Sequence, residues 1–161
     1  MIIYLMGVTG SGKTTTGKLL AARLGAEFID ADDLHPPQNI AKMAEGTPLS
    51  DADRQPWLHA VRVVATERAR LGANVVVACS ALRESYRQIL ASAGKTMFVY
   101  LRADRSLARE RLAARQGHFM PASLIDSQFE TLEEPALNDA LAIDAAQPPE
   151  TIVEQIIERL T

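Results

Sequence analysis

Residues 7–14, which read Gly-Val-Thr-Gly-Ser-Gly-Lys-Thr, match the pattern G-x-x-x-x-G-K-[ST]. In this pattern the glycines let the backbone curl so that successive N–H groups point at phosphate oxygens, and the lysine reaches the β- and γ-phosphates of a nucleotide. A glycine-rich turn without a ligand is the alternative. We predict a nucleotide site with Mg²⁺ on the Thr14 hydroxyl, built from Gly7, Gly10, Ser11, Gly12, Lys13, Thr14 and Thr15.

Two carboxylates, Asp30 and Asp32, follow an apolar segment in the next part of the chain. Residues two apart in a strand project to the same side, so both can face one pocket at the carboxyl edge of a parallel sheet, where such sheets bind ligands. One carboxylate can support a metal ion while the other accepts the proton of a substrate hydroxyl, which suits phosphoryl transfer to a small molecule. The alternative is an Asp-rich turn that caps a helix, and we favour capping for Asp33.

Other classes of nucleotide-binding protein need residues that are missing here. A GTPase switch is expected to carry D-x-x-G after a strand and an N-K-x-D loop, and neither occurs. A motor or AAA-type ATPase is expected to have an acid after the apolar strand beside the phosphate-binding loop, but Val75–Ala78 is followed by Cys79 and Ser80. We interpret Cys79 as a small buried apolar residue and not as a nucleophile.

Strand-like and helix-like segments alternate, which predicts a three-layer α/β fold with a five-stranded parallel sheet and helices on both faces. A single domain spans residues 1–161, and residues 33–71 are long enough for an inserted subdomain. We expect strands at Ile2–Met6, Glu27–Asp30, Asn74–Cys79, Thr96–Leu101 and Ala140–Asp144, and helices at Lys13–Leu24, Asn39–Glu45, Pro56–Leu71 and Pro149–Leu160.

The composition limits the partners of the chain. It has 161 residues, 47% of them apolar, with 17 basic and 20 acidic residues and a net charge of −3. This balance argues against binding of nucleic acid or an anionic membrane, so any anion site must be local. No apolar stretch approaches the roughly 18 residues of a transmembrane helix, and no basic leader precedes the first strand, so we expect a cytoplasmic protein. The single cysteine excludes an intrachain disulfide and fits a reducing compartment.

Beyond the phosphate-binding loop, several segments resemble the gluconokinase family, which is related to shikimate kinase and adenylate kinase. The resemblance implies a P-loop kinase fold and transfer of the γ-phosphoryl group of ATP to D-gluconate, with Mg²⁺ as cofactor and 6-phospho-D-gluconate and ADP as products. It also implies a homodimer. A kinase of another small hydroxy acid such as shikimate and a nucleotide-binding regulator without catalysis are the alternatives. The segments that carry the resemblance are residues 30–36, 51–58, 79–83, 117–119 and 128–133.

On the acceptor side, the resemblance implies a role for each of four residues. Asp32 is expected to hold the acceptor hydroxyl and act as the base, with Asp30 behind the Mg²⁺. Arg54 is expected to pair with the gluconate carboxylate, for which a planar guanidinium is well shaped; a solvated arginine in a turn is the alternative. Ser80 is expected to line the same acceptor pocket. We interpret His35 and Trp57 as structural residues.

Five arginines lie within residues 102–115, and by resemblance residues 111–125 form a mobile lid over an acceptor-binding insertion at 33–71. Arg111 is expected near the adenine side, and Arg115 at the transferred phosphoryl group, where a guanidinium stabilises developing charge. The segment 144–148 is expected to border the adenine by analogy. His118 is expected either to contact the substrate or to brace the lid. For Arg102, Arg105 and Arg109 we favour a solvated helix face.

Overall fold

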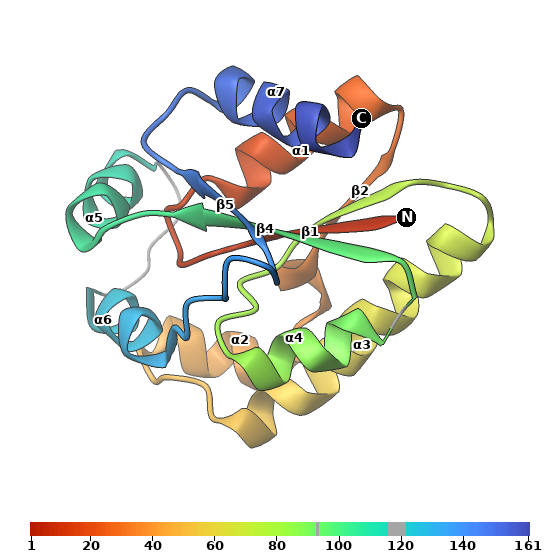
Figure 1. The fold of residues 1–161 in the computed structure, drawn as a ribbon. Coiled ribbons are helices and arrows are strands. Elements are labelled where there is room, and N and C mark those ends of the chain that lie inside the picture. Colours follow the sequence, from red (N-terminus) through yellow and green to blue (C-terminus); the bar gives the residue numbers. More distant parts are fainter. Residues whose placement is uncertain (93, 116–121) are drawn as a thin grey trace.

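The computed structural model describes residues 1–92, 94–115 and 122–161. Five parallel strands form one sheet in the order β2-β3-β1-β4-β5, as Figure 1 shows. The chain visits these strands as β1 (Ile2–Met6), β2 (Glu27–Asp30), β3 (Val75–Ala78), β4 (Thr96–Arg102) and β5 (Leu141–Asp144). All four strand pairings are parallel, which confirms the expected sheet.

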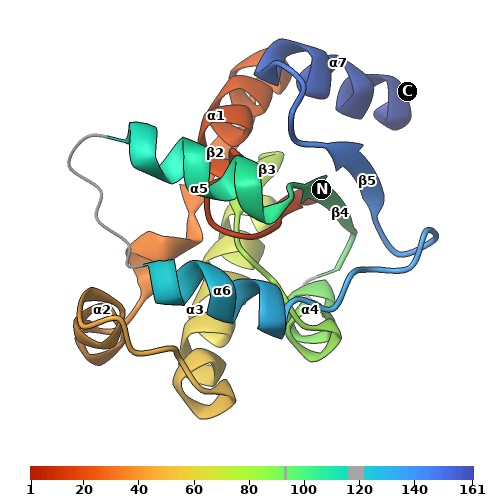
Figure 2. The ribbon, with the colours of Figure 1, turned by 90° about the vertical axis from the view of Figure 1, so that its left-hand side faces the viewer.

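Helices cover both faces of the sheet and surround its carboxyl edge. In Figure 1, α1 (Lys13–Leu24) and α7 (Pro149–Leu160) lie above the sheet, and α3 (Asp51–Arg70) and α4 (Glu84–Ala91) lie below it. Figure 2 views the molecule toward the carboxyl ends of the strands and shows the remaining elements around that edge. They are the 3₁₀ turn η1 (Ala31–Leu34) and the helices α2 (Pro37–Ala44), α5 (Arg105–Ala114) and α6 (Ala122–Thr131).

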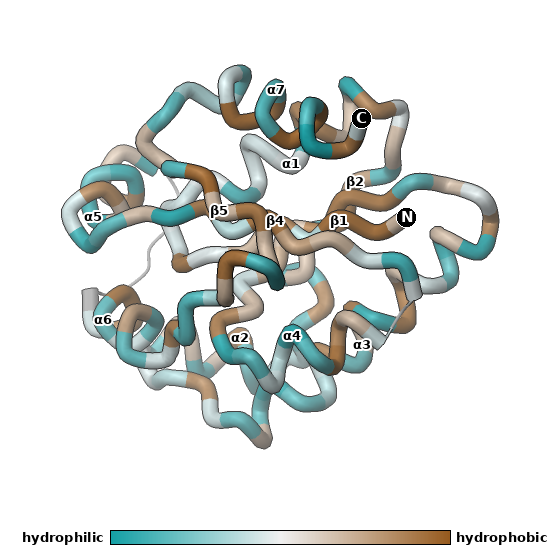
Figure 3. Tube along the Cα trace, viewed as in Figure 1, coloured by the Kyte–Doolittle hydropathy of each residue, from teal (hydrophilic) through white to brown (hydrophobic). Residues whose placement is uncertain are grey.

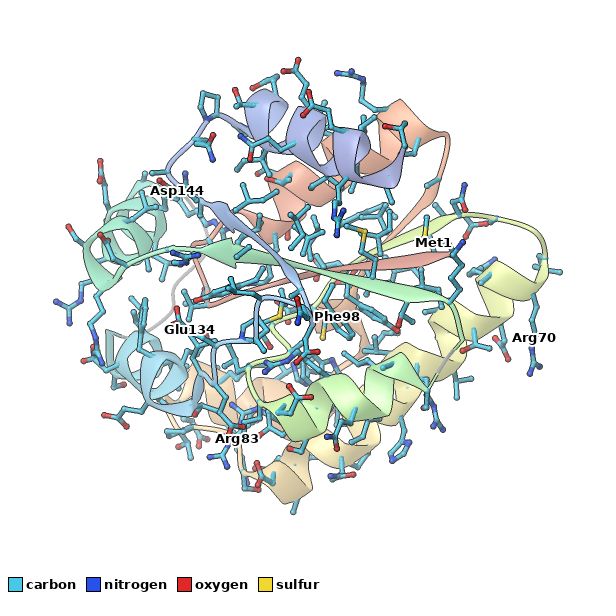
Figure 4. The ribbon with its side chains drawn as sticks, in the orientation of Figure 1. Met1, Arg70, Arg83, Phe98, Glu134 and Asp144 are labelled. Carbon is cyan, nitrogen blue, oxygen red and sulfur yellow. The ribbon has the colours of Figure 1, made fainter. Side chains whose placement is uncertain are left out.

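The alternation of side chains along β1 explains the three layers. Ile3 and Leu5 belong to the core shared with α1 and α7, whereas Tyr4 belongs to the core shared with α3 and α4. Both faces are buried, so the strands are almost continuously apolar, as the brown colour of the central strands in Figure 3 shows. Phe98, labelled in Figure 4, stacks on Tyr4 with ring centroids 5.1 Å apart.

The helix expected from Pro56 begins five residues earlier, at Asp51. Ser50 and Asp53 form a capping box, in which the Ser50 hydroxyl accepts from the Asp53 N–H and the Asp53 carboxylate accepts from the Ser50 N–H. These bonds satisfy the free N–H groups of the first turn, so the helix starts there and the proline lies inside it. The prediction of this boundary was therefore wrong. As a consequence, Arg54 belongs to a helix and not to a turn.

The segment 33–71 is closely integrated with the sheet. Trp57, Leu58, Val61 and Ala65 of α3 are buried in the lower core. By contrast, α2 buries one residue, Asn39. The part of this segment that is free to shape a ligand site is therefore α2 with the loop at 45–50.

Candidate active site

The phosphate-binding loop adopts a conformation that requires glycine. Gly7, Gly10 and Gly12 have φ angles of 147°, 80° and 94°. A Cβ added at Gly10 would lie 2.7 Å from the carbonyl oxygen of Ala108 on α5. Glycine therefore serves both the left-handed backbone and the close approach of α5 to the loop.

Lys13 is held at this loop by two hydrogen bonds. Its Nζ donates to the carbonyl oxygens of Gly7 and Val8, at 3.0 and 2.9 Å. Burial lowers the pKa of Lys13 below its usual range, and the nearby Asp32 carboxylate opposes that shift. The ammonium group is thus fixed at the mouth of the loop, in a position to meet phosphate oxygens.

One cavity at the carboxyl edge of the sheet brings the predicted phosphate-binding and acceptor-binding residues together. A second cavity is lined by the nucleotide-side residues Thr15 and Arg111, together with Gln147 from the segment expected at the adenine. Arg115 lines both cavities, which puts it at their junction. The first cavity is lined by Gly10, Gly12, Lys13, Thr14, Asp30, Asp32, Arg54, Ser80 and Arg115.

The two carboxylates reach this cavity by a different route from the one expected. β2 ends at Asp30 and a 3₁₀ turn follows, so strand alternation does not place Asp32. Asp30 caps the turn by accepting from the Asp32 N–H at 3.0 Å, whereas our sequence analysis assigned capping to Asp33. The position of Asp32 and the identity of the capping residue differ from the expectation for one reason. The Asp30 side chain accepts a hydrogen bond from the Asp32 N–H, which is then not available for strand pairing.

Asp30 and Thr14 form the oxygen pair that fits a magnesium ion. The Thr14 hydroxyl donates to Asp30 Oδ2 at 3.3 Å. Mg²⁺ is usually held by one or two protein oxygens together with phosphates and water, so a larger ligand set is not needed. Accordingly, the described residues include no group of three or more His, Cys, Asp or Glu that could hold a metal.

Arg54 is buried, with 9% of its surface exposed, so the alternative of a solvated turn arginine is wrong. Its Nη1 donates to the carbonyl oxygen of Leu49 at 2.7 Å and to the hydroxyl of Tyr86 at 3.2 Å. The Tyr86 hydroxyl in turn donates to the carboxylate of Asp51. These contacts fix the guanidinium in the cavity wall.

The turn after β3 carries Ser80 into the site and ties it to the phosphate-binding loop. The Ser80 carbonyl accepts from the Gly7 N–H at 3.2 Å. Ala81 has a φ of 44°, a strained value that such sites often hold. Burial raises the pKa of the Cys79 thiol to about 12, in keeping with an unreactive side chain. The buried Arg87 supports the turn by donating to the Ala81 carbonyl at 2.9 Å.

The arginine-rich helix α5 is fastened to the site from two sides. Arg111 donates to the carbonyl oxygens of Ser11 at 3.1 Å and Ala145 at 2.5 Å, which links the loop to the segment after β5. Arg105 and Arg109 are about half exposed and pair with Asp126 of α6. Arg102 is exposed. His118 lies outside the described residues, as does the middle of the expected lid.

Several residues of the cavity wall were not assigned to it from the sequence. Gln128 of α6 accepts a hydrogen bond from the Thr9 N–H at 2.6 Å, so this helix touches the phosphate-binding loop directly. Leu124 and Ser127 of α6 line the cavity as well, as do His35 and Trp57, which the sequence favoured as structural. The segment containing Gln128 contributed to the family resemblance, and that was the one available signal.

Known proteins resemble the chain over almost its whole length. The sequence model of the family described as an AAA domain matches residues 2–135. The thermoresistant gluconokinase of Escherichia coli K12 is 43% identical over 160 residues, which cover 98% of this chain and 91% of that protein. A solved gluconokinase from Sinorhizobium meliloti 1021 is 47% identical, with a TM-score of 0.84, over 94% of this chain and 86% of that chain.

More distant structures share the fold. Shikimate kinase from Aquifex aeolicus is 21% identical and has a TM-score of 0.61, over 99% of this chain and 96% of that chain. A likeness at this identity supports the architecture alone. Together with the parallel sheet it confirms the P-loop kinase fold. In the described residues no helix is both long and apolar enough to span a membrane.

The family match corrects one step of the sequence analysis. β3, the strand beside β1, is indeed followed by Cys79 and Ser80 and not by an acid. The match to the AAA domain shows that this missing acid does not separate the chain from that family. In this chain the acids lie at the end of β2 and in the turn after it, and β2 is one strand farther from β1 than β3 is.

Proposed function

The chain belongs to the gluconokinase family and to the family described as an AAA domain, and from this premise we propose how its residues share the reaction. The protein is a kinase that transfers the γ-phosphoryl group of ATP to D-gluconate, giving 6-phospho-D-gluconate and ADP. One observation carries the assignment of roles: Lys13, Asp32 and Arg54 face a single cavity. That cavity therefore contains Lys13 for the phosphates of ATP, Asp32 for the hydroxyl of gluconate and Arg54 for the carboxylate of gluconate.

Three residues form the catalytic group. Asp32 orients the terminal hydroxyl of gluconate and accepts its proton as the oxygen attacks the γ-phosphorus. Lys13 neutralises the β- and γ-phosphate oxygens, and Arg115, at the junction of the two cavities, stabilises the charge on the phosphoryl group in transit. The Asp32 carboxylate takes up the hydroxyl proton. The bond between the γ-phosphorus and the β-phosphate oxygen breaks, which releases ADP.

The remaining site residues bind and orient. Thr14 and Asp30 would hold Mg²⁺, directly or through water, and the ion when bound would neutralise phosphate charge. The backbone of residues 7–15 cradles the phosphates, and Arg111 supports the nucleotide side. Arg54 pairs with the gluconate carboxylate, since its fixed guanidinium matches two carboxylate oxygens. Ser80 lines the acceptor pocket, and we assign His118 to the acceptor, by contact with the substrate or by bracing the lid, on the family resemblance.

We extend the proposal to the organisation of the chain. Residues 33–71 bind the acceptor, because α2 and the start of α3 supply cavity-lining residues. Residues 111–125 act as the lid, because Arg115 and Leu124 line the cavity from this part of the chain. We also propose a homodimer on the family resemblance, which sedimentation of the purified protein tests. The single cysteine supports the proposed cytoplasmic location.

An assay of ADP release tests the choice of acceptor. The enzyme is given ATP and Mg²⁺ with gluconate, other aldonates, shikimate or nucleoside monophosphates in turn. Gluconate should give the highest kcat/KM because it carries both a hydroxyl for Asp32 and a carboxylate for Arg54, and these two residues line one cavity. Turnover of another acceptor well above that of gluconate would sink the assignment.

Substitution of the base tests the mechanism. Asp32→Asn should lower kcat by at least about 100-fold, since general base catalysis contributes roughly 10²–10⁴, while ATP binding is retained. Asp33→Asn, an exposed neighbour on the same turn, is the matched control and should keep its activity. A non-catalytic regulator would instead tolerate both changes. Lys13→Ala should damage turnover and ATP affinity together.

A further inference from the structure

His35 occupies a buried position close to the proposed base. It is 8% exposed and lines the cavity that also contains Asp32. Its ring stacks on the indole of Trp57, with centroids 4.1 Å apart and an interplanar angle of 16°. Trp57 Nε1 donates to the Ala31 carbonyl at 2.7 Å, so the same pair of rings supports the turn that carries Asp32.

A hydrogen bond from Asn39 determines which nitrogen of His35 carries the proton. Asn39 Nδ2 donates to the carbonyl oxygen of Asp53 at 2.9 Å and lies 3.2 Å from His35 Nδ1. Because a carbonyl can only accept, the amide nitrogen of Asn39 must face this side. His35 Nδ1 therefore accepts from Asn39, and the neutral ring carries its proton on Nε2.

The protonated nitrogen lies near the base, although farther away than in a direct hydrogen bond. His35 Nε2 lies 3.8 Å from Asp32 Oδ1. Within residues 1–92, 94–115 and 122–161, the charged groups near the ring are Asp32 from η1, Arg54 from α3 and, behind Asn39, the ion pair of Lys42 and Asp53. Burial, reinforced by Arg54, lowers the pKa of His35 to about 4, so the ring is neutral near pH 7.

We propose that His35 is a positioning residue for Asp32, held by Asn39 in the tautomer that presents its Nε2–H to the carboxylate. A neutral donor orients the carboxylate without adding a positive charge. An imidazolium at the same place would stabilise the ionised carboxylate and weaken it as a base. The inference rests on the proposed role of Asp32 as the base.

The substitution Asn39→Asp reverses the hydrogen bond at Nδ1. The new carboxylate can only accept, so it favours a proton on Nδ1 and stabilises the imidazolium. We expect kcat with gluconate to fall about tenfold at pH 7 while KM for ATP stays within twofold. Unchanged kcat would overturn the inference.

Tryptophan fluorescence gives a readout independent of turnover. Trp57 is the one tryptophan of the chain, and an imidazolium stacked on an indole quenches its emission more strongly than a neutral imidazole does. Wild type should lose emission near pH 4, and Asn39→Asp should lose it at least one pH unit higher. An unshifted midpoint would show that Asn39 does not set the state of the ring and would overturn the inference.

A second pair of variants covers the possibility that Asn39→Asp does not fold. His35→Phe keeps the stack on Trp57 but has no donor, so kcat should fall at least tenfold with KM for ATP unchanged. His35→Gln returns a neutral donor and should recover part of that loss. His59→Phe, an exposed histidine on α3, is the matched control. Wild-type kcat in His35→Phe would contradict the inference.

Asp32→Asn, measured in parallel, separates this inference from the proposal on which it rests. If Asp32→Asn keeps wild-type kcat, the assignment of the base itself fails. If Asp32→Asn is inactive and His35→Phe is fully active, the base stands and the positioning role of His35 is refuted.

Discussion

Arg54 combines two properties that a carboxylate-binding residue needs. Its guanidinium is fixed by Leu49 and Tyr86, so little conformational entropy is lost on binding. It also lies in a cavity wall, where the reduced exposure to water strengthens a charge-assisted hydrogen bond. Both properties support the role proposed for Arg54 in binding the gluconate carboxylate.

Replacing Arg54 by lysine should weaken the binding of gluconate while leaving ATP unaffected. A lysine keeps the charge but loses the planar fork, and a charge-assisted bond contributes about 1.5–3 kcal/mol. KM for gluconate should rise roughly 10- to 100-fold in steady-state kinetics. Arg70→Lys, an exposed arginine at the end of the same helix, should behave as wild type. An equal rise in KM for gluconate in both variants would show that Arg54 does not bind the acceptor.

His35 should make the protein less stable in acid. Its pKa is about 4 in the folded chain against 6.5 ordinarily, so the unfolded chain binds a proton that the folded chain does not. The stability is complete above pH 6.5 and falls as the pH drops toward 4, by about 3 kcal/mol for this shift. Urea denaturation across this range should show a weaker pH dependence for His35→Gln than for wild type. His59→Gln should retain the wild-type dependence, and identical slopes in all three proteins would contradict the prediction.

Helix α6 connects the expected lid to the phosphate-binding loop through one side chain. Gln128 accepts from the Thr9 N–H, while Asp126 on the same helix pairs with Arg105 and Arg109 of α5. The exposed ion pairs contribute little, about 0–1 kcal/mol. Among the described residues, Gln128 gives α6 a direct hydrogen bond to the loop, through which movement of α6 would reach the nucleotide.

Replacing Gln128 by methionine should loosen this connection. The Thr9 N–H loses its acceptor, at a cost of about 1 kcal/mol, and the loop is less well ordered for phosphate. KM for ATP should rise roughly fivefold with the fold intact by circular dichroism. Gln88→Met, an exposed glutamine on α4, is the control. An unchanged KM for ATP would mean that α6 does not support the loop.

The whole molecule reconciles a net negative charge with the binding of two anions. The chain carries a net charge of −3, yet Lys13, Arg54 and Arg115 line one cavity at the carboxyl edge of the sheet. Arg111 supports the loop with bonds to backbone carbonyls. Anion binding here depends on local placement and not on the overall charge.

Because the nucleotide binds the folded chain, it should raise the thermal stability of the whole molecule. ATP with Mg²⁺ at about 100 times its Kd stabilises the folded state by ~2.7 kcal/mol. For 161 residues this corresponds to a rise in Tm of roughly 5–10 °C in a thermal shift experiment. Lys13→Ala should show little rise, whereas Lys18→Ala, exposed on α1, should respond as wild type. An undiminished rise in Lys13→Ala would show that Lys13 does not contribute to nucleotide binding.

Local sequence patterns determined the strands, the phosphate-binding loop and the helices α1 and α7. Their apolar periodicity and their glycines act over a few residues, so the expected bounds agree with the structure to within one residue for these elements. The sequence patterns did not predict α4 and α6. The start of α3 was predicted too late, at Pro56, because proline is common at the start of a helix, whereas the capping box at Ser50 and Asp53 starts the helix at Asp51. Short polar helices of this kind are stabilised by tertiary packing more than by their own pattern.

The site residues also fall into two groups, those that the sequence indicates and those that the tertiary structure adds. Residue types and motif spacing alone indicate Lys13, Asp30 and Asp32. The family resemblance implied Arg54 at the acceptor, but only the tertiary structure added His35 and Gln128 to the same cavity, because these residues come from separate elements whose mutual arrangement is set by packing on the sheet. A hydrogen bond between residues 119 positions apart, such as that from Thr9 to Gln128, leaves no local signal in the sequence.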